Sequence, residues 1–250
     1  MPTASPTHVL ILTHEHTDFD ALASMLAASR LYPQSVPVLP RQINRNLEAF
    51  LADYHDLLPF VHLEDLPKRR VDHVIAVDTQ TVQPVRGMNQ GTTGLVIDHH
   101  PEQVGYRAVF KDIRADYGST CTILTEHLRA VDVNISERTA TAMLYAIKSD
   151  TLFFARQTNR SDLDAFTYLY PLADPALIRK MEGAEITMER LEYVREALDR
   201  GGHRDQVFCA YLGVPPREDV IVYVADFFLQ LEETKWTIVA GRVNDHLVVS

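Results

Sequence analysis

The sequence contains few of the features that mark secreted or membrane proteins. Its 250 residues include two cysteines, Cys121 and Cys209, which cannot form a disulfide framework and lack the spacing of metal-binding pairs. No apolar run approaches the roughly 18 residues that are needed to cross a bilayer. The first seven residues, Met1–Thr7, lack the basic and apolar segments of a secretory signal. We therefore expect a cytoplasmic protein that does not enter a membrane.

Positive charge is also scarce. The chain has 24 Lys and Arg against 34 Asp and Glu, which gives a formal net charge of −10 at pH 7. This balance argues against a surface that neutralises the phosphates of long duplex nucleic acid. A small anionic substrate is still compatible with it, because bound divalent cations can reverse the sign of the charge in a local site.

Short apolar runs alternate with segments of helical periodicity. The runs HVLILT (8–13), VIAV (74–77) and LVI (95–97) are typical of buried strands. This alternation predicts an α/β fold with a doubly wound, mostly parallel sheet and helices on both faces. The helices are expected near residues 21–31, 43–54, 119–130, 137–148, 162–170 and 176–182.

Residues that favour helix starts precede several of these segments. Ser136 precedes the fourth helical run, Ser161 has an acidic residue three positions later, and Asp174 is followed by Pro175. A further amphipathic segment ends at the pair Gly201-Gly202, which is a typical helix stop. These signals set the expected start of three helices and the end of a fourth.

We predict three parts of the chain: a main domain at 1–185, a linker helix at 186–202, and a smaller α/β domain at 203–250. Within the last part the pattern predicts a strand, a helix and two more strands. The chain stops directly after an apolar, strand-like run, from which we expect this domain to be incomplete.

The first candidate site follows the first predicted strand. There the sequence HEHTDFD contains His14, Asp18 and Asp20, and ligands of open α/β sheets collect at the carboxyl ends of strands. Imidazole nitrogen and carboxylate oxygen suit divalent cations. Helix capping is the alternative for these residues, because Asp is favoured at N-caps.

Three more polar clusters follow apolar elements. Asp78 ends VIAV, the sequence Asp98-His99-His100 follows LVI, and Asp150 ends a helical run. Each would reach the same edge of the sheet, where so many carboxylates would be unfavourable without cations. Two cations about 3.5–4 Å apart would resolve this, and such a pair can generate a hydroxide and stabilise a phosphoryl displacement.

With these four motifs in order, the sequence resembles the DHH phosphoesterase superfamily. That superfamily includes RecJ exonucleases, oligoribonucleases that also act on pAp, cyclic-dinucleotide phosphodiesterases and family II pyrophosphatases. The segments THEHTDFDALAS and PVLPRQINRNLEAF are similar to those of one subgroup. That subgroup forms the N-terminal part of proteins with CBS and tRNA nucleotidyltransferase domains. The motifs cover residues 8 to about 160.

The resemblance implies two divalent cations, manganese first and magnesium or cobalt as alternatives. It implies that Asp78 bridges the two, that His100 lies near the substrate phosphate, and that Asp98 orients the histidines. The implied ligands are His14, Asp18 and Asp78 for one cation, and Asp20, Asp78, His99 and Asp150 for the other.

Candidates for substrate binding are less marked. Ser119 and Thr120 begin a predicted helix whose free N–H groups could bind phosphate, although an ordinary Ser/Thr cap explains them equally well. Arg156 and Arg160 follow Asp150 and could neutralise substrate charge. Relatives often have a glycine after Asp-Thr, and they carry a glycine-rich Gly-Gly-Gly-His stretch later. Here Leu152 stands in place of that glycine and no such stretch is present, and we expect these two departures to affect turnover and substrate preference.

We therefore expect a manganese-dependent phosphoesterase that hydrolyses short oligoribonucleotides or a small nucleotide such as pAp. The expected partners are a small nucleotide or short single-stranded RNA, and we expect binding neither to long duplex nucleic acid nor to a membrane. The sequence is compatible with a homodimer. The alternative is a non-catalytic nucleotide- or RNA-sensing module of a larger tRNA-processing protein, which would bind ligand without hydrolysing it.

Overall fold

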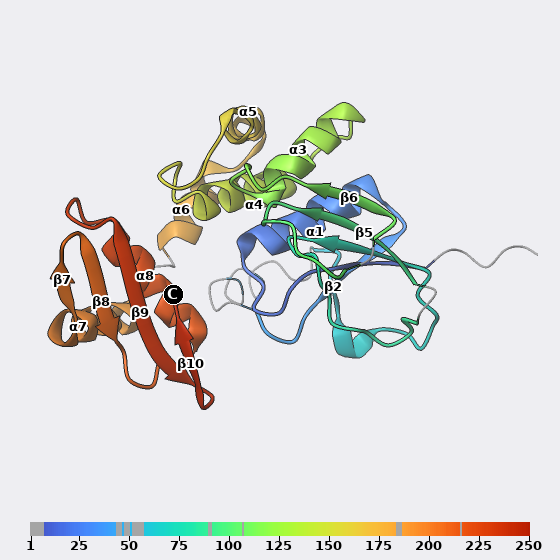
Figure 1. The fold of residues 1–250 in the computed structure, drawn as a ribbon. Coiled ribbons are helices and arrows are strands. Elements are labelled where there is room, and N and C mark those ends of the chain that lie inside the picture. Colours follow the sequence, from blue (N-terminus) through green and yellow to red (C-terminus); the bar gives the residue numbers. More distant parts are fainter. Residues whose placement is uncertain are drawn as a thin grey trace, which may run out of the picture. The chain divides into compact units, whose positions relative to one another are not determined.

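The computed structural model describes residues 8–43, 47, 51, 58–89, 92–106, 108–183, 187–215 and 217–250. The chain divides into two compact units, Met1–Met181 (unit 1) and Glu182–Ser250 (unit 2), each of which is described by itself (Figure 1). Within the described parts of both units, no helix is long and apolar enough to cross a bilayer.

Unit 1 is built on a six-stranded sheet in which every pairing is parallel. The strand order is β3-β2-β1-β4-β5-β6. Strands β1 to β3 are added toward one edge of the sheet and β4 to β6 toward the other, so the order of the strands reverses between β1 and β4. This is the order of doubly wound α/β folds, which confirms the predicted fold class. The strands are β1 (Val9–Leu12), β2 (Ser35–Leu39), β3 (Val61–His62), β4 (His73–Val77), β5 (Thr93–Asp98) and β6 (Phe110–Ile113).

Four helices of unit 1, namely α1, α3, α4 and α5, begin at residues whose side chains cap them. The Ser136 hydroxyl accepts from the Thr139 N–H at the start of α4, as predicted. The start predicted at Ser161 is wrong: Asn159 caps α5 and forms a capping box with Asp162. The helices are α1 (Phe19–Leu31), η2 (Leu63–Asp65), α3 (Thr120–Ala130), α4 (Glu137–Asp150), α5 (Arg160–Leu169), η3 (Tyr170–Leu172) and α6 (Pro175–Gly183).

Alternate residues of β1 and β4 belong to two separate cores. Ile11, Ile75 and Ile97 pack with α1, α3 and α4, which lie together on one face of the sheet (Figure 1). Leu10 and Leu12 point to the opposite face and pack against η2 and the segment 71–88. Of the helix predicted near 43–54, residues 47 and 51 are helical and buried in the first core, and most of the rest lies outside the described residues.

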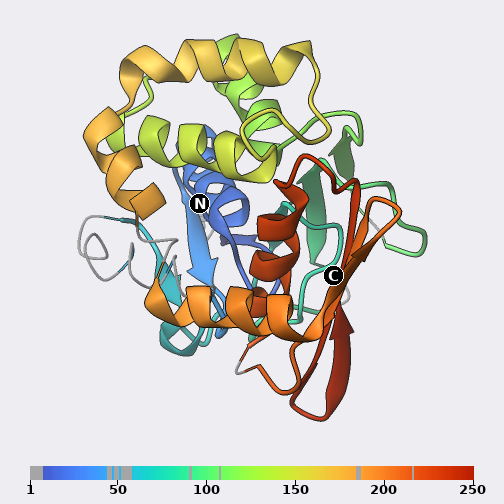
Figure 2. The same ribbon diagram turned by 90° about the vertical axis from the view of Figure 1, so that its left-hand side faces the viewer.

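Unit 2 contains a mixed four-stranded sheet in the order β10-β9-β8-β7. Its helices α7 (Met188–Arg200) and α8 (Glu218–Leu229) pack on one face of the sheet and cross each other (Figure 2). The segment predicted as a linker helix is α7, and its Val194 and Ala197 belong to the core of this unit. The strands are β7 (Gly202–Arg204), β8 (Val207–Tyr211), β9 (Trp236–Val243) and β10 (His246–Val249).

The two faces of the sheet in unit 2 differ in burial. Phe208, Val239 and Val243 point inward and pack against α8. Trp236 and Ile238 on the opposite face of β9 are 70% and 48% exposed. The outer face of this sheet is therefore apolar and solvent-accessible.

Candidate metal centre

The predicted site residues meet at the carboxyl edge of the sheet in unit 1. His14 follows β1, Asp78 follows β4 and His99 follows β5, so three adjacent parallel strands deliver them to one edge. The reversal of strand order between β1 and β4 opens a crevice at this edge in doubly wound folds. Asp20 reaches the same place from the first turn of α1, and Asp150 from the last residue of α4.

Asp78 is the centre of the arrangement. Its Oδ2 lies 3.3 Å from His14 Nε2, and its Oδ1 lies 3.6 Å from His99 Nε2. The Thr120 hydroxyl donates to Oδ1 at 2.9 Å. The residue is 3% exposed, and its φ of 57° is a left-handed conformation that Asp tolerates better than most residues. One buried carboxylate thus presents a different oxygen to each histidine.

Asp20 is fixed by the start of α3. Its carboxylate accepts from the Ser119 hydroxyl at 2.7 Å, the Thr120 N–H at 2.7 Å and the Cys121 N–H at 3.0 Å. Ser119 and Thr120 are fully buried. The N–H groups predicted to bind a phosphate are therefore directed at a carboxylate of the protein. The hydroxyls of the same two residues hold Asp20 and Asp78.

Both histidines turn Nε2 toward the carboxylates. His99 Nδ1 lies 3.2 Å from the carbonyl oxygen of Tyr117, and His14 Nδ1 lies 2.7 Å from that of Glu15. A carbonyl can only accept, so in the neutral ring each Nδ1 carries the proton and each Nε2 offers its lone pair. His99 Nε2 lies 3.2 Å from Asp150 Oδ2 and 3.8 Å from Asp20 Oδ2.

A second layer holds the Asp98-His99-His100 loop. The Asp98 carboxylate lies 2.8 Å from His100 Nδ1, so Nε2 of this half-exposed ring is the nitrogen left for a ligand. Gln80 donates to Asp98 at 2.7 Å and to the carbonyl of Pro101 at 3.0 Å, and it accepts from the Gln103 N–H at 2.6 Å. Gln80 was not predicted, because no local pattern marks a glutamine whose partners lie on another loop.

Burial and the neighbouring charges shift the pKa values of the clustered groups. Burial, and then repulsion from Asp20 and Asp18, raises the pKa of Asp78 well above its usual range. Burial, with Asp20 and Asp18, also raises the pKa of Asp150 to about 6, against the hydrogen bond from His99. Burial disfavours the charged form of His99, yet Asp150, Asp20 and Asp78 raise its pKa to about 10. These carboxylates need positive charge, and the donor set suits divalent cations.

Among the described residues, three groups of side chains could each hold a metal ion: each residue offers one ligand atom, and within a group these atoms lie within 4.8 Å of one another. Asp78 belongs to two of these groups, and the third joins Asp20, His99 and Asp150. The division of ligands between two cations that the resemblance implies stays a prediction. Asp18 also caps α1 through Oδ1, which accepts from the Ala21 N–H at 3.0 Å. The groups are His14, Asp18 and Asp78; Asp20, His99 and Asp150; and Asp78, His99 and His100.

The predicted substrate-binding arginines are exposed. The Arg160 side chain is 92% exposed and pairs with Asp164 in its own helix at 3.7 Å, and Arg156 lies on the exposed segment after Asp150. Their part in substrate binding stays a prediction. Between them and Asp150, residues 152–154 have φ values of 46°, 52° and 65°. This is the left-handed region that favours glycine. Placing a residue other than glycine there destabilises the folded chain by roughly 1–2 kcal/mol.

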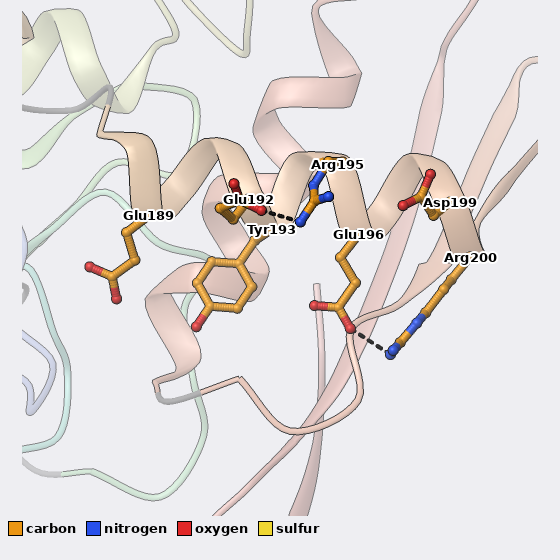
Figure 3. Close-up of a pocket in the computed structure, with 7 residues that line it drawn as sticks. All are labelled: Glu189, Glu192, Tyr193, Arg195, Glu196, Asp199 and Arg200. Carbon is orange, nitrogen blue, oxygen red and sulfur yellow. Dashed lines mark hydrogen bonds and ion pairs between the residues drawn. The ribbon is translucent and has the colours of Figure 1, made fainter.

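A separate hollow of about 470 Å³ lies along α7 in unit 2 (Figure 3). Two of its carboxylates, Glu192 and Glu196, already pair with Arg195 and Arg200. The hollow is therefore a charged helix surface and shares no residue with the metal centre. Its lining is Glu189, Glu192, Tyr193, Arg195, Glu196, Asp199 and Arg200.

Fold and site together define an α/β protein with a candidate His/Asp centre for divalent cations at the switch point of a parallel sheet. Residues 8–147 match the family model of the DHH family, N-terminal domain. The chain belongs to the DHH family.

Similar proteins fall into three kinds. An uncharacterized protein of Methanocaldococcus jannaschii is 30% identical over 97% of this chain and 51% of its own length. The A-adding tRNA nucleotidyltransferase of Geobacter sulfurreducens is 29% identical over 76% of this chain and 22% of its own. The manganese-dependent inorganic pyrophosphatase of Bacillus subtilis is 29% identical over 60% of this chain and 50% of its own. The chain thus spans about half or less of the length of these relatives.

A solved structure supports the fold. An exopolyphosphatase-related protein from Bacteroides fragilis superposes with a TM-score of 0.68 over 97% of this chain and 78% of that one, at 13% identity. At this identity the likeness concerns the fold alone.

Proposed function

We propose that the protein is a manganese-dependent phosphoesterase that hydrolyses short oligoribonucleotides or a small nucleotide such as pAp. The observation that carries the proposal is the sharing of Asp78 between two groups of ligands, one on each of its oxygens. Two cations held there would polarise a phosphoryl oxygen and lower the pKa of a water molecule. The manganese-dependent pyrophosphatase among the similar proteins supports the choice of metal.

The residues of the chain would divide the work. His14 and Asp18 would hold one cation. Asp20, His99 and Asp150 would hold the other, and both would neutralise charge on the substrate. His100 is half-exposed and held through Nδ1 by Asp98, so its Nε2 can donate to a phosphate oxygen as charge develops there. Asp98 accepts from Gln80 as well, and these hydrogen bonds lower its pKa against the effect of burial, which keeps it ionised.

The A-adding tRNA nucleotidyltransferase among the similar proteins supports a nucleotide or RNA substrate. The same match favours a second candidate, a non-catalytic module that senses nucleotide or RNA, because the chain covers 22% of that larger protein. This module would bind ligand with the same cations and would leave it uncleaved.

The test is hydrolysis of pAp, a short oligoribonucleotide, a cyclic dinucleotide and pyrophosphate by metal-stripped protein with manganese restored. We expect manganese-dependent turnover of a nucleotide, lowered roughly 10²–10³-fold or more by Asp78→Asn. Asp245→Asn, at an exposed position in unit 2, is the matched control and should keep full turnover. Turnover that survives Asp78→Asn would overturn the proposal. Ligand binding without turnover would favour the sensing module.

A further inference from the structure

The carbonyl that orients His99 belongs to a turn at residues 114–118, between β6 and α3. The Tyr117 carbonyl oxygen lies 3.2 Å from His99 Nδ1, on the side of the ring opposite the carboxylates. The position of this carbonyl therefore decides where His99 Nε2 points. Whatever holds the turn also holds one candidate cation ligand.

The backbone of the turn is tied at both ends. The Arg114 N–H donates to the Asp98 carbonyl at 3.0 Å, and the Tyr117 N–H donates to the Arg114 carbonyl at 3.0 Å. The Gly118 N–H lies 3.0 Å from both oxygens of buried Asp162, in the first turn of α5. A Cβ on Gly118 would lie 2.5 Å from Thr151, so the turn fits closely against the end of α4.

The side chain of Tyr117 is locked as well. Its hydroxyl accepts from Arg114 Nη1 at 2.9 Å and from the Ser161 hydroxyl at 3.1 Å, and it donates to Glu126 at 3.0 Å. Asp112 fixes the guanidinium of Arg114 through two hydrogen bonds of 2.8 and 2.9 Å. The phenol thus contacts α3 and α5 directly, through Glu126 and Ser161, and is linked to β6 through Arg114.

Among the described residues, the ring of His14 has a more local support. Its Nδ1 contacts the carbonyl of Glu15, the next residue in the chain, and the side chain of Glu15 is exposed. Both histidines therefore direct Nε2 at Asp78, but their Nδ1 atoms are supported differently. One ring is held by a network that joins three elements, and the other by its own loop.

We propose that Tyr117, held by Arg114 and Glu126, is a positioning residue that orients His99 and so sets how tightly the Asp20, His99 and Asp150 group binds a cation. It does not touch the substrate. The ligands of the other group, His14 and Asp18, lie outside this network. The inference rests on the proposed function only in requiring two bound cations.

The experiment titrates metal-stripped full-length protein with Mn²⁺ by calorimetry. The binding step that disappears in His99→Gln identifies the His99 group. Tyr117→Phe and Arg114→Gln should weaken this step about tenfold, the lower end of the range for residues that orient metal ligands, and should leave the other step unchanged. The visible absorption of the Co²⁺-loaded protein, which reports coordination geometry, should change in the same variants.

Unit 1 offers a matched control pair. The Arg129 guanidinium lies 4.6 Å from the ring of Tyr168, much as that of Arg114 lies 5.0 Å from the ring of Tyr117. Tyr168→Phe and Arg129→Gln should leave both binding steps and the Co²⁺ spectrum unchanged. Equal weakening of both steps, or unchanged affinity in Tyr117→Phe with its circular dichroism intact, would overturn the inference. Wild-type protein that binds no Mn²⁺ would instead overturn the proposed function.

Discussion

The two units bury different kinds of side chain. The sheet edge of unit 1 buries the carboxylates of Asp20, Asp78 and Asp98, together with the threonine and serine hydroxyls that contact them. The core of unit 2 is apolar, with Phe208 and Phe228 stacked 3.8 Å apart at its centre. Thr234 is the one buried polar side chain in the described part of unit 2, and its hydroxyl has no hydrogen-bond partner there.

This difference in buried side chains suggests that unit 2 depends on apolar packing for stability, whereas the carboxylates of unit 1 serve cation binding. A buried carboxylate destabilises a fold unless it is paired, whereas an apolar core of the same size stabilises it. Unit 1 carries several such groups at one edge, which is expected where a ligand completes the structure. Unit 2 carries no comparable cluster in its described residues. A change in its core should therefore act on folding alone, while changes at the edge of unit 1 should act through cations.

Phe228→Ala should have the largest effect on stability and none on cation binding. Removing a buried phenylalanine costs about 3–5 kcal/mol, because its contacts are lost and a cavity is left. Hydrogen exchange monitored by mass spectrometry should show faster exchange across β8, β9 and α8. The Mn²⁺ affinity of unit 1 should stay at its wild-type value. A loss of affinity would show that the chemistry of unit 1 depends on the core of unit 2.

Mn²⁺ should stabilise unit 1 selectively. A ligand that binds the folded state at 100 times its dissociation constant adds about 2.7 kcal/mol to the free energy of unfolding. We expect slower hydrogen exchange in β1, β4, β5 and the start of α3, and unchanged exchange in unit 2. Asp78→Asn should abolish the protection, and Asp245→Asn should retain it. Equal protection of both units from exchange would contradict the prediction that cations stabilise unit 1 alone.

The position of the candidate metal centre could be predicted from the sequence because most of its residues follow strand ends. Asp78 and His99 each follow a short apolar run, and parallel strands end at one edge, so strand recognition alone places them together. β2 was missed because its Pro37 argues against an internal strand. β6 was missed because its first residues are exposed and polar in part.

Contacts between distant segments could not be predicted. The start of α3 has the N–H groups of a phosphate site, but what occupies them is Asp20, about 100 residues earlier in the chain. Gln80 and Tyr117 act through Asp98 and His99, which lie 18 residues away. A local pattern shows what a segment offers, and only the fold shows what accepts it.

Cation binding should strengthen as the pH rises. In the metal-free protein the pKa of His99 is raised from 6.5 to about 10, so the protonated ring stabilises the folded state. This stabilisation is fully present below pH 6.5 and is lost as the pH rises toward 10. A cation needs the neutral ring, so its binding releases this proton. The Mn²⁺ affinity should rise up to tenfold, about 1.4 kcal/mol, for each pH unit between 7 and 8.5. Asp150, with a pKa of about 6, is already ionised in this range.

Calorimetry in buffers with different ionisation enthalpies measures the released proton directly. We expect close to one proton for the step that involves His99. A flat affinity profile with no released proton would show that His99 does not bind the cation. A slope that persists in His99→Gln would assign the proton to another ligand.

The smallest effect comes from one substitution made in both units. Thr234→Val removes a buried hydroxyl that has no partner, so it should raise the free energy of unfolding by up to about 1 kcal/mol. Thr122→Val removes a hydroxyl that donates to Asp162 at 2.6 Å, so it should lower the free energy of unfolding by about 1 kcal/mol. Urea unfolding of both variants gives the signs. Opposite signs would show that unit 1 depends on buried polar contacts that unit 2 lacks, since the side chains removed are identical; equal signs would show that the two interiors treat a buried hydroxyl alike.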